Sequence, residues 1–218
     1  MQIPRPTGEP WHVADATRKL AQRGELPGAS VFDLAAAASR SARAAGVSLE
    51  DRLALALPAS WLVNSPAVSR VLQRWAHAPQ RAVWLALVEL LEEEAPEDGD
   101  EELALALRAL GPEPYVLEAA SKVLALLVPD RVPLLPLPAR VFVLGDARAA
   151  DPSSFSAMIA WFRGATEAHA VELAAIAKAH SSAPLSGPQA LDRLLWFDSE
   201  GHRHFAPGPG AEEAPGEA

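Results

Sequence analysis

Hydrophobic residues recur along most of this chain at the spacing of one face of an α-helix. In residues 65–79, Val68, Val71, Leu72 and Trp75 occupy positions i, i+3, i+4 and i+7, so they share one face. Strict alternation of hydrophobic and polar residues, which favours strands, is nearly absent. The pattern therefore predicts a chain built from amphipathic helices.

Helix-start signals precede several of these periodic segments. A serine followed three residues later by Asp or Gln is typical of a capping box, and a proline after a capping residue is typical of a first helical position. These signals are the pairs Ser30 and Asp33, Ser48 and Asp51, Ser65 and Pro66, Asp151 and Pro152, and Ser186 and Gln189.

Periodicity and end signals together predict an all-α fold, a compact multi-helix bundle of about ten short helices. The predicted helical segments are 9–24, 30–46, 48–62, 65–79, 79–94, 101–111, 113–129, 151–164, 166–180 and 186–197, with a further apolar helix near residue 145. Pro58 should end the third segment. In the fifth, the expected buried stripe is Val83, Leu87, Leu90 and Leu91.

The chain divides into a leader at 1–9, a single helical domain at 10–205 and a low-complexity tail at 206–218, which we expect to be disordered. Residues 92–102 combine Pro96, Gly99 and dense negative charge, which predicts a solvated loop and an alternative subdomain boundary. Residues 196–205 fit either a helix end or a short C-terminal β-hairpin.

Charge is distributed unevenly along the chain. The net charge is -9, from 28 acidic and 19 basic residues, and residues 89–102 hold nine acids and no base. The acidic run therefore equals the whole excess. Without it and the tail acids Glu212, Glu213 and Glu217, the chain holds 16 acids and 19 bases, so its body is mildly basic. Two interpretations remain for this run, a solvated surface loop and an acidic arm that contacts a basic partner.

Composition limits the cellular location of the protein and the kinds of reactive site that it can contain. The chain has 0 cysteines, which excludes disulfides, thiolate metal sites and a cysteine nucleophile. Its first residues resemble no signal peptide, and no apolar run approaches the roughly 20 residues of a membrane span. We expect a cytoplasmic protein that does not insert into a membrane.

Histidines offer only weak candidates for a metal site or for acid–base chemistry. His169 and His180 share a helical stripe edged by Glu172, but eleven residues of helix separate them by about 16 Å, so they cannot bind one ion. We therefore predict no metal, no cofactor and no catalytic residue. An enzyme using His169, Glu172, His202 or His204 as an acid or base is the third hypothesis for function.

The C-terminal segment carries the most concentrated binding chemistry in the sequence. Cationic and aromatic groups together suit an anionic or planar ligand. The alternative is a latch whose aromatic side chains pack on the bundle. The residues concerned are Trp196, His202, Arg203, His204 and Phe205.

Residues 110–145, "LGPEPYVLEAASKVLALLVPDRVPLLPLPARVFVLG", resemble part of the helix-hairpin-helix DNA glycosylases and their uncharacterised bacterial relatives. The hairpin glycines of that family are reduced to Gly111, and residues 135–138 read Leu-Pro-Leu-Pro where its catalytic aspartate would lie. Lys122 lies on the following helix, so no catalytic lysine is carried over. The resemblance implies a relative without glycosylase chemistry.

The sequence therefore favours two hypotheses for the function of the protein. The first is a non-enzymatic cytosolic module that binds another protein through the acidic run or the C-terminal segment. The second, implied by the resemblance, is a nucleic-acid-associated protein that contacts phosphates and whose affinity falls steeply with salt. Its arginines would have to line one surface: Arg70, Arg74, Arg81, Arg131 and Arg140.

Overall fold

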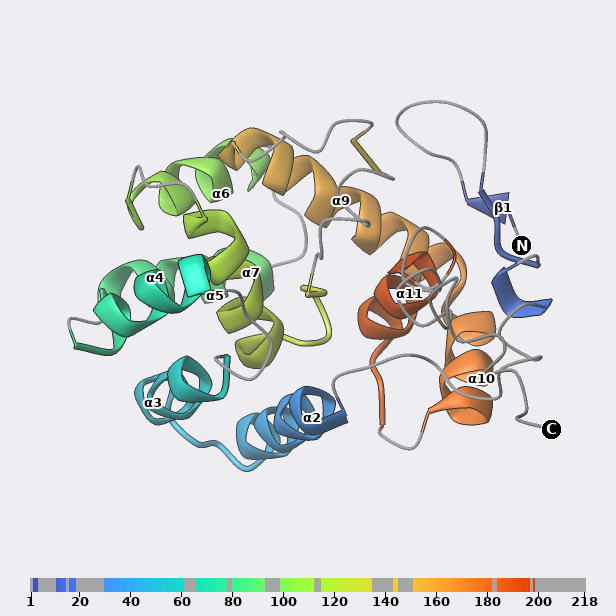
Figure 1. Ribbon diagram of the computed structural model, residues 1–218, viewed down its shortest axis with the longest axis horizontal. Coiled ribbons are helices and arrows are strands. Elements are labelled where there is room, and N and C mark those ends of the chain that lie inside the picture. The colour runs from blue at the N-terminus through green and yellow to red at the C-terminus, as the bar shows by residue number, and fades with distance from the viewer. Residues whose placement is uncertain are drawn as a thin grey trace, which may run out of the picture.

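The computed structural model confirms an all-α protein (Figure 1). It describes residues 2–3, 11–14, 16–18, 30–60, 66–77, 80–92, 99–111, 115–134, 143–144, 151–181, 184–196 and 198. The longer helices of this part are α2 (Ser30–Ala44), α3 (Leu49–Ala59), α4 (Pro66–His77), α5 (Arg81–Glu92), α6 (Gly99–Arg108), α7 (Val116–Leu127), α9 (Pro152–Ala168), α10 (Ala170–His180) and α11 (Gly187–Trp196). Two short strands pair beside them, β1 (Gln2–Ile3) and β2 (Trp11–His12).

Helix α7 is the centre of one half of the molecule. All its residues are buried except Glu118, which is half-buried, and α2, α3 and α4 pack against it. A helix that is apolar on every side requires neighbours on every side. Its one cation, Lys122, is buried and pairs with Glu118 at 3.2 Å, as expected for a charge that loses its hydration.

Helix α9 joins this half to the C-terminal helices. It packs against α6 and also against α10 and α11, and Figure 1 shows it running between the two groups. Its buried face includes Phe155, Met158, Ile159 and Phe162, the stripe that the spacing predicts. None of the described helices is long and apolar enough to span a bilayer.

Two aromatic pairs make edge-to-face contacts inside the bundle, and one of them joins two helices. The rings of Trp75 on α4 and Trp84 on α5 are perpendicular, with centroids 5.1 Å apart, and both side chains are fully buried. Trp161 and Phe162 make a similar edge contact within α9. Edge-to-face geometry places the positive ring edge on the negative ring face.

Three of the predicted helix starts are confirmed by hydrogen bonds. The Ser48 hydroxyl accepts from the amide of Asp51 at 3.1 Å. Asp151 accepts from the amides of Ser153 and Ser154, both at 3.0 Å, and Pro152 is the first helical residue. Each bond satisfies an amide that the first helical turn leaves without a backbone acceptor.

Ser186 and Gln189 form the reciprocal capping box of α11. The Gln189 side chain accepts from the Ser186 amide at 2.9 Å, and the Ser186 hydroxyl accepts from the Gln189 amide at 3.4 Å. The carboxylate of Asp33, the second residue of the predicted box at Ser30, accepts a hydrogen bond from Arg193 of α11 at 2.9 Å. Asp33 therefore joins two helices that lie 160 residues apart in sequence.

The N-terminal prediction needs correction. Residues 9–24 were expected to form a helix and residues 1–9 a leader, yet Trp11–His12 pairs antiparallel with Gln2–Ile3, with Ile3 opposite Trp11. Both of these side chains are buried in the core, and helix begins only at Val13. Burial of a large aromatic side chain outweighs the local helix-start signal of Pro10.

The loop predicted at residues 92–102 is shorter in the structure, because helices extend into both of its ends. Helix α5 continues to Glu92, and α6 already begins at Gly99, so residues 99–102 are helical rather than part of a loop. Glu101 and Glu102 lie close to the start of α6, where carboxylates interact favourably with the positive end of the helix dipole. Residues 93–98 lie outside the described residues.

Three further boundaries differ from the prediction. Helix α9 continues through Gly164 to Ala168, and the break before α10 falls at His169, whose backbone leaves the helical region at φ -128° and ψ 27°. Helix α3 includes Pro58 and ends at Ala59. Trp196 is the last residue of α11 within the described residues, and Phe197 lies outside them.

Candidate functional site

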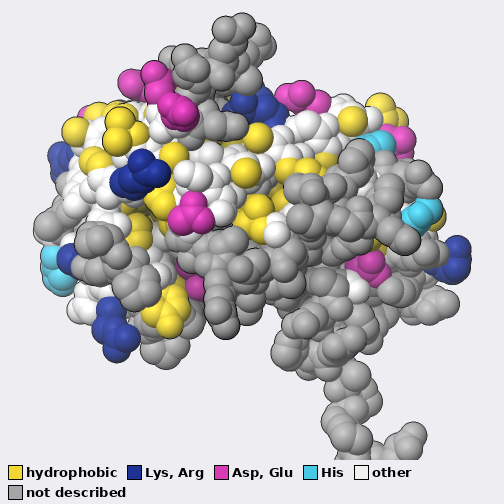
Figure 2. Space-filling view, turned by 90° about the horizontal axis from the view of Figure 1, so that it is seen from above, with side chains coloured by type: hydrophobic (Ala, Val, Ile, Leu, Met, Phe, Trp, Pro, Cys, Tyr) yellow, Lys and Arg dark blue, Asp and Glu magenta, His cyan; other side chains and the backbone are white. Residues whose placement is uncertain are grey.

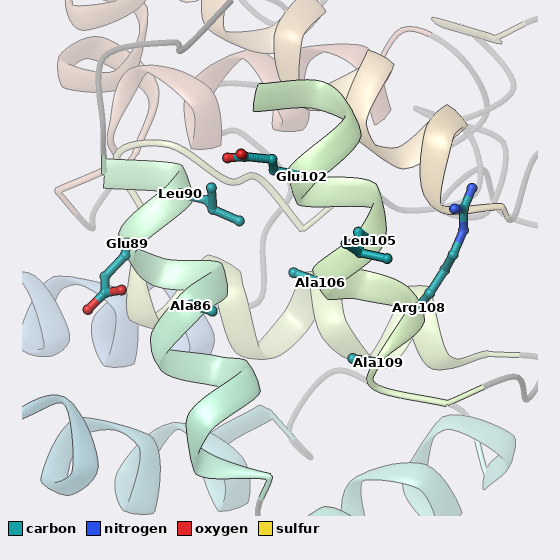
Figure 3. Close-up of a pocket in the computed structure, with 8 residues that line it drawn as sticks. All are labelled: Ala86, Glu89, Leu90, Glu102, Leu105, Ala106, Arg108 and Ala109. Carbon is teal, nitrogen blue, oxygen red and sulfur yellow. The ribbon is translucent and has the colours of Figure 1, made fainter. Parts of the chain in front are cut away.

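A groove lies between α5 and α6 on the surface of the bundle (Figure 3). It is shallow and open and has a volume of about 770 Å³. Among the described residues, α5 contributes Ala86, Glu89 and Leu90, α6 contributes Glu102, Leu105, Ala106 and Arg108, and Ala109 follows directly after α6. Figure 3 shows Leu90 and Ala106 on the sides of the helices that face each other.

The buried face of α5 is rotated from the predicted one, although Leu87 and Leu91 are buried as predicted. Trp84, Leu87, Val88 and Leu91 are buried, whereas Val83 and Leu90 are only half-buried. The indole of Trp84 packs on Trp75, which turns this face of α5 towards α4. Leu90 is consequently left at the edge of the helix, next to α6.

Helix α6 presents an apolar side chain to solvent beside this edge. Its buried residues are Leu103, Ala104 and Leu107, which face the core, but Leu105 is 66% exposed. A single exposed leucine is common on protein surfaces. Here Leu105 and Leu90 line one hollow together with three alanines, so the apolar side chains of the two helices lie next to each other.

Charged side chains border the apolar floor. Glu89 and Arg108 lie on the outer sides of α5 and α6, and Glu102 lies near the N-terminal end of α6 (Figure 3). Two carboxylates against one guanidinium give the groove a net negative charge. This end of the groove belongs to the acidic run of residues 89–102, which the sequence identifies as a candidate arm for a basic partner.

Of the C-terminal residues predicted to bind ligand, only Trp196 lies within the described residues. Trp196 ends α11, and His202, Arg203, His204 and Phe205 lie outside the described residues. That binding site stays a prediction. The neighbouring Asp198 accepts a hydrogen bond from the indole nitrogen of Trp11 at 2.8 Å, which ties the β1–β2 pair to the end of α11.

The structure brings together only part of the predicted arginine surface. Arg70 and Arg74 are exposed one turn apart on α4, and Arg81 is exposed at the start of α5. Arg131 is half-buried in the turn after α7, and Arg140 lies outside the described residues. On the described part of the face in Figure 2, Lys and Arg side chains are scattered rather than gathered in a stripe.

The histidine candidates do not converge within the described residues. His169 lies at the junction of α9 and α10, Glu172 is exposed in the first turn of α10, and His180 ends that helix. His169 is therefore not inside the helical stripe that was predicted for it. Among the residues that the structure describes, no three His, Asp or Glu side chains are grouped to hold a metal ion.

Comparison of the chain with protein-family models, with curated proteins and with solved structures found no match. The resemblance of residues 110–145 to the helix-hairpin-helix glycosylases stays a prediction. Within this region, Val116–Leu127 form α7 and Gly111 has a positive φ of 131°.

Proposed function

We propose that the protein is a cytosolic interaction module whose α5–α6 groove binds an amphipathic helix of another protein. The groove itself carries this proposal, since it combines an apolar floor with the exposed Leu105 and an acidic border. It supports a macromolecular partner better than a small ligand, because an open groove cannot surround most of a small molecule's surface.

The apolar lining of the groove favours a helix as the bound element. Apolar side chains spaced at i, i+3 and i+4 on an amphipathic helix can reach a hydrophobic groove from one face. The alanines Ala86, Ala106 and Ala109 keep the floor low, so the partner's side chains can approach the backbones of α5 and α6. Leu90 and Leu105 then supply the larger apolar contacts.

Charge defines the chemistry of the partner. Glu89 and Glu102 favour Lys or Arg beside the partner's apolar face, and Arg108 favours an acidic residue on the opposite side. Such rim pairs contribute more to the association rate and to specificity than to affinity. The partner is therefore an amphipathic helix that is basic along one border.

A synthetic helical peptide of leucine and lysine tests the proposal. Fluorescence anisotropy should show binding to the purified protein, and binding should weaken as salt rises. Leu105→Lys removes an apolar contact and repels the peptide, so affinity should fall by tenfold or more, equivalent to about 1.4 kcal/mol. Leu34→Lys is the matched control, because Leu34 is 56% exposed on α2 and lies outside the groove.

Two further peptides separate groove binding from general adhesion. A scrambled peptide of the same composition lacks an apolar face, and a leucine–glutamate peptide reverses the charge. Both should bind much more weakly than the leucine–lysine peptide. Equal loss of affinity in Leu34→Lys and Leu105→Lys, or equal binding of all three peptides, would show that the groove is not the binding surface.

A further inference from the structure

A second, more enclosed cavity lies between α2 and α3 and reaches Leu126 of α7. Its volume is about 250 Å³, the space of about eight water molecules in the liquid. Alanines of α2 and α3 form most of its wall, among them Ala38, Ala42 and Ala56. Their small side chains leave the space between these packed helices unfilled.

Two polar groups in the wall lack hydrogen-bond partners within the described part of the chain. Arg52 is only 8% exposed, and its Nη1 donates to the carbonyl of Leu127 at 3.1 Å, but its Nε is buried and donates to nothing there. The hydroxyl of Ser39 is also buried and has no hydrogen-bond partner within the described residues. A buried donor without an acceptor has lost its hydration and gains no hydrogen bond in return, so both groups would favour a ligand that brings an acceptor.

The charges around Arg52 leave one positive charge in excess. Arg43, in the last turn of α2, pairs with Glu92 of α5 at 3.2 Å. Burial lowers the pKa of Arg52, Glu92 raises it, and Arg43 lowers it further. A guanidinium nevertheless stays protonated in proteins, so the buried cation has to be balanced by an anion.

We propose that this cavity binds a small carboxylate with an apolar tail. The carboxylate accepts hydrogen bonds from Nε of Arg52 and from Oγ of Ser39, and the tail lies along the alanines and Leu126. A single buried guanidinium balances one negative charge, which favours a carboxylate over the more highly charged phosphate ester. The mainly apolar walls favour a ligand with an apolar tail. A chain of about eight carbon atoms matches the volume.

Octanoate is the probe, and isothermal titration calorimetry on the full chain is the measurement. Octanoate should bind with a dissociation constant at or below about 1 mM. Octanol shares the tail and acetate shares the head group, and each should bind at least about tenfold more weakly. Octanol binding as tightly as octanoate would overturn the role of Arg52, and absence of octanoate binding would overturn the site.

Variants locate the binding without disturbing the fold. Ala42→Leu fills the cavity from the half-exposed surface of α2 and should abolish octanoate binding, whereas Ala44→Leu, exposed on the same helix and outside the cavity, should bind as the parent chain does. Ser39→Ala removes one donor and should weaken binding several-fold. Unchanged affinity in Ala42→Leu would place octanoate elsewhere, while Leu105→Lys should leave octanoate binding intact whatever the fate of the α5–α6 groove.

Discussion

Gly187 allows α11 to approach α9 more closely than any other residue would. A Cβ atom at this position would lie 2.4 Å from Cγ2 of Thr166, well inside the contact distance of two carbon atoms. Gly187→Ala should therefore lower the free energy of unfolding by about 1–3 kcal/mol through overpacking, measured by urea denaturation. In a Thr166→Ser background, which lacks Cγ2, the same substitution should cost much less. An equal cost in both backgrounds would contradict this account.

Gly164 gives the opposite expectation. It lies exposed within α9, its φ is not in the left-handed region, and a Cβ atom there would meet no atom within 4 Å. Gly164→Ala should raise the free energy of unfolding by about 0.5–1 kcal/mol, because alanine loses less backbone entropy on entering a helix. Urea denaturation of the two glycine variants side by side should show opposite signs, and destabilisation by Gly164→Ala would be inconsistent with an open surface at this position.

At the scale of the element, Asp151 shows how a cap couples α9 to pH. Hydrogen bonds from the hydroxyl and amide of Ser154 lower the pKa of Asp151. The stabilisation is therefore complete above the unfolded pKa of about 3.9 and is lost as pH falls through the lower folded pKa. Asp151→Ala should cost about 1 kcal/mol at neutral pH, and its deficit relative to the parent chain should shrink in acid.

Asp151→Asn is the control for this titration, since asparagine caps about as well as aspartate but does not ionise. Its stability relative to Asp151→Ala should vary little with pH. Urea denaturation at a series of pH values measures both differences. A deficit of Asp151→Ala that stays constant into strong acid would show that the carboxylate charge contributes nothing to the cap.

Most helices could be predicted because their signals are local. The stripe of α9 and the caps at Ser48, Asp151 and Ser186 depend on residues within one or two turns, and the structure confirms them. The N-terminal strand pair could not be predicted, because it depends on Trp11 finding the core and Asp198, which lies 187 residues away. Local propensity yields to such tertiary contacts.

Only part of the groove could be predicted from the sequence. The acidic run identified its charge, but the apolar floor requires knowing which face of α5 is buried. The predicted stripe omitted Trp84, and including this large side chain would have rotated the buried face and left Leu90 at the edge. The cavity beside Arg52 depends on the spacing of α2 and α3, which no periodicity specifies.

At the scale of the whole molecule, a buried cluster connects α2 and α11, the first and the last of the longer helices described. It consists of Asp33, Asp192 and Arg193. Arg193 lies 2.9 Å from Asp33 on α2 and 3.6 Å from its neighbour Asp192. Arg193→Met removes the cation that both carboxylates face and should cost about 3–5 kcal/mol. Asp33→Asn leaves Arg193 beside Asp192 and should cost less. Urea denaturation compares them, and equal or reversed costs would argue against a shared cation.

The perpendicular indoles of Trp75 and Trp84 provide an optical reporter that needs no label. Two chromophores held at 5.1 Å couple their electronic transitions, so the protein should show a paired positive and negative band in its ultraviolet circular dichroism. Since one indole belongs to α4 and the other to the helix that forms a wall of the groove, loss of this signal would reveal their separation even where total helix content does not change.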